Sequence, residues 1–206
     1  MRLGIPASAL LLACALPLLA GCSVPEMQVH NAAGFAQTPL GKTAVLKVTA
    51  RPLGKPKSAA VLWGVMQVPH AQESFAELLA HCASKAGGLD VIPPTDVTAA
   101  IKRAGMKPTL DPTPEQLASF IEALGCASYL TAHVEAWGES YLLTSSKATI
   151  RFVVSCHVPG AEEPLWSVSV DRTRRGISHR EAAISALRDA FEYIAKQAAA
   201  GPQQGS

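Results

Sequence analysis

Residues 127–170 alternate between apolar and polar side chains, and this alternation constrains the fold more than any other feature of the chain. A period of two is typical of a β-strand that buries one face. The turn-forming segments Thr144–Lys147 and Pro159–Gly160 divide the stretch into three strands, which are expected to form an antiparallel meander. The apolar positions are Leu130, Ala132, Val134, Ala136, Ile150, Phe152, Val154, Cys156, Val158, Leu165, Trp166, Val168 and Val170.

The opposite face of the first meander strand carries aromatic side chains among polar ones. Tyr129 and Trp137 fall on this face, and Tyr141 follows on the continuation of the strand beyond Gly138, which is expected to mark a bulge or bend. Aromatic residues on a polar sheet face are typical of an interface. They are equally compatible with cover by the N-terminal segment or the C-terminal helix. Tyr129, Trp137 and Tyr141 are therefore candidate interface residues.

Four other segments have apolar residues three and four positions apart, which predicts helices. They begin after Pro69, near Thr95, at Thr113 and at Ser178. The last two starts have the pattern of a capping box, with Gln116 and Glu181 three residues after the N-cap. Glycines end the first three helices, at Gly87-Gly88, Gly105 and Gly125. Short apolar runs at Ala59–Met66 and Leu89–Ile92 predict two further strands.

This order of elements predicts an α+β domain, in which a mixed sheet of about five strands packs against helices. The domain is expected to span residues 59–200, followed by a disordered tail at 201–206. Residues 22–58 are rich in Pro, Gly and Lys and predict a flexible tether with a mean reach of roughly 30 to 36 Å. Within it, Thr43–Thr49 is compatible with a short edge strand.

The N-terminus has the successive parts of a lipoprotein signal peptide, expected to span residues 1–21. A positive charge at Arg2 precedes an apolar run from Leu10 to Leu19, which is too short to span a bilayer. The sequence Leu19-Ala20-Gly21-Cys22 then places a thiol directly after small residues. Cys22 is the expected lipidation site, against the alternatives of an ordinary signal peptide or a buried apolar segment. Since Ser23 stands where Asp would retain the protein in the inner membrane, the outer membrane is expected, with the domain facing the periplasm.

Three cysteines remain after Cys22, so at most one disulfide can form within the mature chain. They are Cys82, Cys126 and Cys156. Cys82 and Cys156 fall on the apolar faces of a predicted helix and strand, where a free thiol behaves as a small hydrophobic group. Buried thiols are favoured over a disulfide.

The sequence has no nucleophile elbow, phosphate-binding glycine loop or paired-cysteine metal motif. It therefore predicts neither an enzyme nor a cofactor. His133 and His157 lie on adjacent predicted strands and could bind a metal with Glu135 as third ligand, although polar residues on the outer face of a sheet are the ordinary case. With 18 basic and 16 acidic residues the chain is nearly neutral, which argues against a nucleic-acid partner.

A basic cluster of Arg172, Arg174 and Arg175 lies between the last predicted strand and the last helix. Such a cluster could contact anionic lipid headgroups, a phosphate or a partner. A solvated loop is the alternative and the more ordinary explanation.

Several motifs resemble the GNA-type family of outer-membrane lipoproteins. They are Gly88-Leu89-Asp90-Val91-Ile92-Pro93, Gly125-Cys126-Ala127-Ser128-Tyr129-Leu130, Trp137-Gly138-Glu139-Ser140-Tyr141 and Thr144-Ser145-Ser146. Cys126 and Trp137 depart from the family pattern, where Ala and Tyr are usual. The likeness covers about residues 59–171.

The resemblance implies a fold similar to the N-terminal domain of TolB and the periplasmic part of CsgG, often as a dimer. It also implies an accessory, non-enzymatic role beside a CsgG-like lipoprotein in an envelope export or surface-assembly complex. Two alternatives remain open: a small-ligand or metal-binding periplasmic module, and an activator of a cell-wall synthase.

Overall fold

The computed structural model describes residues 26–51, 66–67, 70–142 and 145–200. The signal peptide, Cys22, the tail and most of the predicted strand at Ala59–Met66 lie outside them. The described strands are β1 (Met27–Asn31), β2 (Lys42–Ala50), β3 (Met66–Gln67), β4 (Asp90–Val91), β5 (Ser128–Leu142), β6 (Ser145–His157) and β7 (Trp166–Arg175). The α-helices are α3 (Ala71–Lys85), α4 (Pro94–Arg103), α5 (Pro114–Leu124) and α6 (His179–Ala200), and η2 (Phe35–Gln37) is a 3-10 turn.

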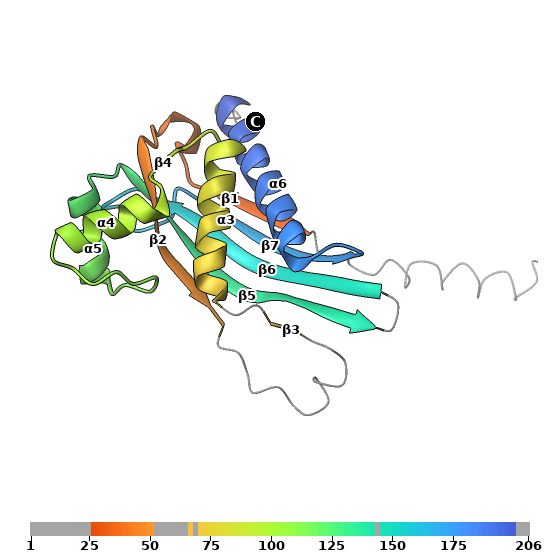
Figure 1. Cartoon of the computed structure of the whole chain (residues 1–206). Coiled ribbons are helices and arrows are strands. Elements are labelled where there is room, and N and C mark those ends of the chain that lie inside the picture. Colours follow the sequence, from red (N-terminus) through yellow and green to blue (C-terminus); the bar gives the residue numbers. More distant parts are fainter. Residues whose placement is uncertain (1–25, 52–65, 68–69, 143–144, 201–206) are drawn as a thin grey trace, which may run out of the picture.

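The strands form one mixed sheet in the order β1-β7-β6-β5-β2-β4, with β3 pairing to β5 beside this path (Figure 1). β5, β6 and β7 are antiparallel neighbours, which confirms the predicted meander. β2 lies parallel to both β5 and β4. The α+β prediction is confirmed, and the described residues form seven strands in place of the predicted five or so.

The prediction of a tether is wrong for residues 27–50, because they supply two strands of the sheet. β1 pairs with β7, and β2 lies between β5 and β4 instead of forming a short edge strand. Gly41 brings the start of β2 against the start of β5: its φ is +53°, and an added Cβ would lie 2.7 Å from the Cβ of Ala127. The Pro and Gly residues of this region lie in its connecting segments. Their presence led the composition to predict a tether, although β2 itself is an apolar run.

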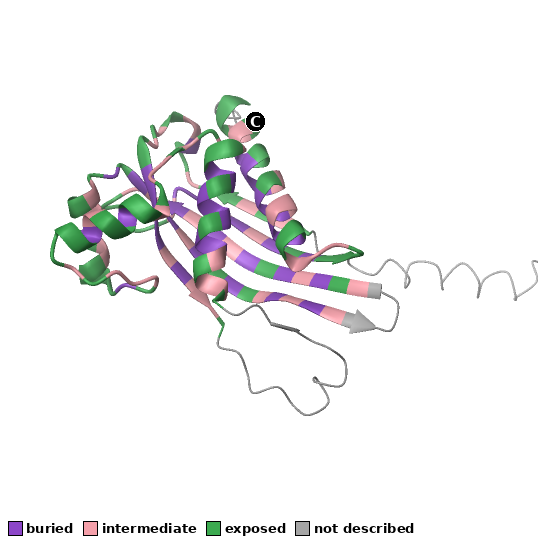
Figure 2. Ribbon diagram, viewed as in Figure 1, coloured by how far each residue is buried: buried purple, intermediate pink, exposed green. Residues whose placement is uncertain are grey.

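α3 and α6 cover one face of the sheet and enclose the main core (Figures 1 and 2). Phe75 on α3 packs against Phe152 on β6, with ring centroids 5.1 Å apart. Phe191 on α6 meets Trp166 on β7 edge-on at 5.8 Å. The core therefore spans the sheet from β7 to β2.

α4 and α5 pack against the other face of β2 and form a smaller cluster. Its buried members are Ala44, Leu46, Val97, Ile101, Phe120 and Cys126. The predicted capping box at the start of α5 is confirmed, since Thr113 accepts from the Gln116 N–H while the Gln116 side chain accepts from the Thr113 N–H. β2 thus contributes alternate residues to two different cores.

A β-bulge in β5 reverses the faces predicted for its second half. The register with β6 shifts between Val134 and Ala136, so one extra residue exchanges the inward and outward positions that follow. Trp137 is consequently buried, at 7% exposure, and meets Phe75 edge-on at 5.7 Å. Its predicted place beside Tyr129 on the polar face is wrong. Gly138 continues the strand, as expected, but the bulge lies before it.

Cys82, Cys126 and Cys156 are free and buried, which confirms the prediction of buried thiols. Burial raises the pKa of Cys82 to about 11 and that of Cys156 to about 12. Burial also raises the pKa of Cys126. Within the described ranges, no helix is both long and apolar enough to cross a membrane.

Candidate interaction surfaces

The outer face of the meander is the face of β5, β6 and β7 turned away from α3 and α6. Its side chains are exposed or half-buried, in contrast to the buried residues with which they alternate. They are mainly polar. The outer face comprises Tyr129, Thr131, His133, Glu135, Arg151, Val153, Ser155, His157, Ser167, Ser169 and Asp171.

Hydrogen bonds and stacking hold the histidines of the outer face in place. The His157 ring stacks on Tyr129 with centroids 5.0 Å apart, and its Nε2 lies 3.1 Å from Thr131 Oγ1. Burial lowers the pKa of His157, which favours the neutral ring. His133 Nδ1 lies 2.8 Å from Thr49 Oγ1 on β2. Each imidazole is therefore oriented by a threonine hydroxyl.

The sheet register separates the two histidines proposed as metal ligands. His133 lies opposite Val153, whereas His157 lies opposite Tyr129, four residues away along β5. In the part of the chain that the structure describes, no group of three or more His, Cys, Asp or Glu side chains is arranged to hold a metal ion. The structure does not bring the predicted ligands together.

A charged triad crosses the outer face from β5 to β7. Arg151 on β6 lies 2.8 Å from Asp171 through Nη2 and 3.8 Å from Glu135 through Nη1. All three side chains are 40 to 48% exposed, so each pair contributes less than about 1 kcal/mol to stability. The triad orders the surface more than it stabilises the fold.

The predicted basic loop is part of β7, and two of its three arginines are paired. Arg172 is buried at 6% exposure, with Nη1 2.7 Å from Asp189 on α6. Its Nε lies 3.3 Å from Glu26, close enough for charge attraction but without hydrogen-bond geometry. Arg174 donates two hydrogen bonds to the same Glu26 carboxylate, at 3.0 and 3.1 Å. The solvated-loop interpretation is wrong for Arg172.

A buried carboxylate joins the end of β5 to the start of α6. Glu139 Oε1 lies 2.6 Å from both the backbone N and the ring Nδ1 of His179. Trp137 Nε1 donates to the His179 carbonyl at 3.2 Å. No local sequence signal identifies this junction, because its partners lie 40 residues apart and the bulge that turns Glu139 inward is not predicted.

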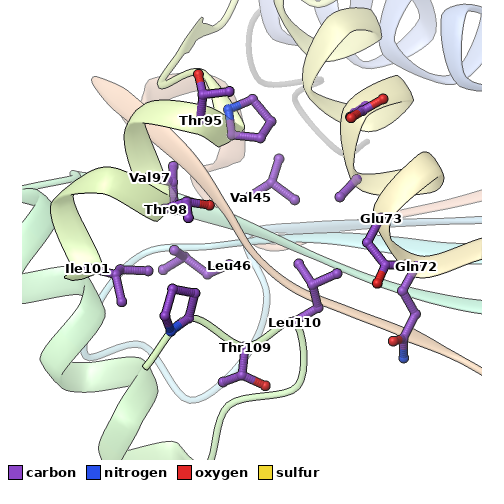
Figure 3. A pocket seen from close by; sticks show the side chains of 14 residues that line it. Val45, Leu46, Gln72, Glu73, Thr95, Val97, Thr98, Ile101, Thr109 and Leu110 are labelled. Atoms are coloured by element: carbon purple, nitrogen blue, oxygen red, sulfur yellow. The ribbon is translucent and has the colours of Figure 1, made fainter. Parts of the chain in front are cut away.

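A cleft of about 630 Å³ opens beside β2, between α3 and α4 (Figure 3). Val45, Leu46, Ile101 and Leu110 form apolar walls, and the rim carries polar side chains, among them those of Gln72, Glu73, Thr95, Thr98 and Thr109. β4 pairs with β2 only at Lys42 and Thr43, and the Val48 N–H donates to the Leu110 carbonyl. The cleft residues come from separate segments, so no motif predicts it.

Of the candidate interface residues, only Tyr129 has a described side chain on the outer face. Trp137 faces the core. Tyr141 lies in β5 opposite Ser146, and its side chain falls outside the described part.

No protein-family model matches the chain, and no curated protein matches it. Solved structures share its fold. The PelC dodecamer from Paraburkholderia phytofirmans aligns with a TM-score of 0.54 at 13% identity, over 82% of this chain and 95% of that one. Lipoprotein GNA1162 from Neisseria meningitidis aligns with a TM-score of 0.50 at 19% identity, over 76% of this chain and 99% of that one. At these identities the likeness establishes the fold alone.

Proposed function

We propose that this protein is a non-enzymatic lipoprotein of the bacterial outer membrane, anchored through Cys22 and facing the periplasm. In this proposal it binds other envelope proteins as an accessory component of an export or surface-assembly complex. A CsgG-like lipoprotein is the expected partner, as the resemblance to the GNA-type family implies.

The outer face is the observation that carries the proposal. It presents mainly polar side chains, several of which are already oriented by one another, as in the Tyr129–His157 stack and the Arg151 triad. A surface ordered before binding loses little conformational entropy when a partner docks. The buried thiols, whose pKa values are raised, support a binding role over a nucleophilic one.

The structural neighbours support the same proposal in two ways. One is described as a lipoprotein and another as a dodecamer. A lipid anchor and assembly from several copies are therefore both compatible with this fold, and a second copy of the chain is a further expected partner.

Site-specific photo-crosslinking in cells tests the proposal. A photoreactive phenylalanine analogue replaces Tyr129 on the outer face or, as the matched control, Tyr193 on α6, which is 40% exposed. We expect Tyr129 to give an adduct with an envelope lipoprotein or a second copy, while Tyr193 gives none. Adducts of equal yield from both positions, or none from Tyr129, would contradict a partner on the outer face.

The cleft favours a second candidate function, the binding of a small apolar ligand. Its volume lies within the range of small-molecule sites, and its walls are apolar. Thr98→Trp is expected to fill the cleft and abolish binding of an uncharged apolar dye, while Ser119→Trp on the exposed face of α5 retains it. Unchanged dye binding in Thr98→Trp would remove this candidate.

A further inference from the structure

The described chain enters the sheet only four residues after the expected lipidation site. Glu26 is already fixed, because its carbonyl accepts from the Asp171 N–H at 3.0 Å and its carboxylate binds Arg174. Four residue steps separate Cys22 from Glu26. A chain of this length reaches at most about 14 Å. The anchor is therefore close to the sheet, in contrast to the long tether predicted from composition.

The pairing of β1 determines toward which end of the sheet the anchor lies. β1 is antiparallel to β7, with Met27 opposite Val170. Glu26 is thus at the end of β1 that faces Arg175, where β7 ends and β6 begins. The four residues of β7 beyond Asp171 extend about 13 Å. The reach of the anchor therefore matches the distance to this end of the sheet.

Basic side chains lie on both faces of this end, which we call the hairpin end and define by Lys147, Arg174, Arg175 and Arg180. Arg174 and Arg175 are consecutive in β7 and so point to opposite faces, and Arg180 follows His179, which binds Glu139 opposite Ala148. All four are exposed. Lys147 lies directly opposite Arg175 in the register of β6 and β7. Like charges in this position destabilise a sheet unless an anion compensates them. No ion pair within the described ranges includes Lys147 or Arg175.

The acidic groups nearby are engaged with partners. Glu26 binds Arg172 and Arg174. Glu181 accepts from the Ser178 N–H at 2.9 Å, in the cap of α6, and this hydrogen bond lowers its pKa. Lys147, Arg175 and Arg180 therefore remain available to an external anion.

We propose that the hairpin end rests directly on the anionic phospholipid headgroups of the membrane that holds the anchor. This inference rests on the proposed lipidation of Cys22. The meander strands then run away from the bilayer, and α4 and α5, at the opposite end of the sheet in Figure 1, point into the periplasm. A strand of 15 residues, the length of β5, spans about 50 Å, so the two ends differ widely in height above the membrane.

Fluorescence quenching in liposomes tests this orientation with the full lipidated protein. A fluorophore is attached through Thr173→Cys near the hairpin end or, as the control, through Ser119→Cys on α5; both positions are exposed and the native thiols are buried. A quencher carried on lipid headgroups is expected to quench the first probe strongly and the second little. Equal quenching of a lipidated protein would overturn the orientation. If instead the protein carried no lipid and did not insert into liposomes, the proposed function itself would be overturned.

Neutralising matched pairs of basic residues tests whether the hairpin end contacts the headgroups or is only within reach of them. The mature full chain with Cys22→Ser is mixed with vesicles of phosphatidylethanolamine and phosphatidylglycerol. We expect Lys147→Gln with Arg175→Gln to weaken binding about fivefold per residue, since each basic side chain near an anionic surface contributes about 1 kcal/mol. Lys102→Gln with Arg103→Gln on α4 removes the same charge and is expected to leave binding unchanged. Equal losses from the two pairs, or no binding by the parent chain, would overturn contact at the hairpin end.

Discussion

The α3–α6 layer and the α4–α5 pair pack against opposite faces of the sheet and differ in how much of it they cover. The first layer encloses apolar residues from β7, β6, β5 and β2. The second rests mainly on β2 and the residues just before β5. A cluster with few buried neighbours opens at a lower free-energy cost than the main core does. We therefore expect α3 and α6 to govern global stability, while α4 and α5 open locally.

Truncation in the main core has the largest expected effect. Phe152→Ala removes a ring that is 1% exposed and packed against Phe75. The lost contacts and the remaining cavity are expected to lower the free energy of unfolding by about 3–5 kcal/mol. Urea unfolding measures the change. Val153→Ala is the control, because Val153 follows Phe152 in the chain but points to the outer face, and it is expected to cost less than about 1 kcal/mol. If both substitutions lowered the free energy of unfolding equally, the division into a buried and an outer face would be contradicted.

Truncation in the smaller cluster has the next largest expected effect. Phe120→Ala removes an equally buried ring from α5. Because α4 and α5 are expected to open without the rest, we expect a loss of no more than about 3 kcal/mol, the low end for this substitution. Hydrogen exchange should accelerate in both helices and stay slow in β6. Parallel acceleration in β6 would show that the two regions unfold as one unit.

The alkylation rates of the three thiols compare how readily the two regions open within one native protein. Cys126 belongs to the smaller cluster, whereas Cys82 and Cys156 belong to the main core. We expect alkylation of Cys126 to be at least about tenfold faster, equivalent to an opening free energy lower by about 1.4 kcal/mol. Mass spectrometry of partly alkylated protein measures the three rates.

The alkylation rates should rise with pH, because the thiolate is the reactive form and burial raises the pKa of all three groups. A denatured sample is the control, in which the three thiols should react alike. Equal native rates would refute local opening of α4 and α5.

Loss of the α5 N-cap has the smallest expected effect. Thr113→Ala removes the hydroxyl that accepts from the Gln116 N–H and is expected to cost about 1 kcal/mol. Thr113→Ser retains the hydroxyl and should restore most of the loss. Hydrogen exchange should report the change in α5 and not in α6, whose own cap at Ser178 is untouched. Faster exchange in α6 would contradict independence of the two layers.

Sequence periodicity identified the elements in which buried residues recur at a regular spacing. The β5–β7 meander and the starts of α5 and α6 were predicted because alternation and capping are local patterns. The role of Trp137 was missed, since a single extra residue at Glu135 reverses the alternation without any residue type that marks it. For the candidate sites, the outer face was predicted through Tyr129, whereas the cleft and the Glu139–His179 junction have no local signature.

The sequence alone determined the type and approximate limits of most elements, the α+β class, the burial of the three described thiols and the prediction of a lipid anchor at Cys22. Only the tertiary structure decided that residues 27–50 enter the sheet, that Arg172 is buried in a charge network, and that only three residues lie between Cys22, the predicted anchor, and Glu26. The physical reason is that helix and strand periods are read within a few residues, whereas strand pairing depends on partners more than 140 residues away, as between Met27 and Val170.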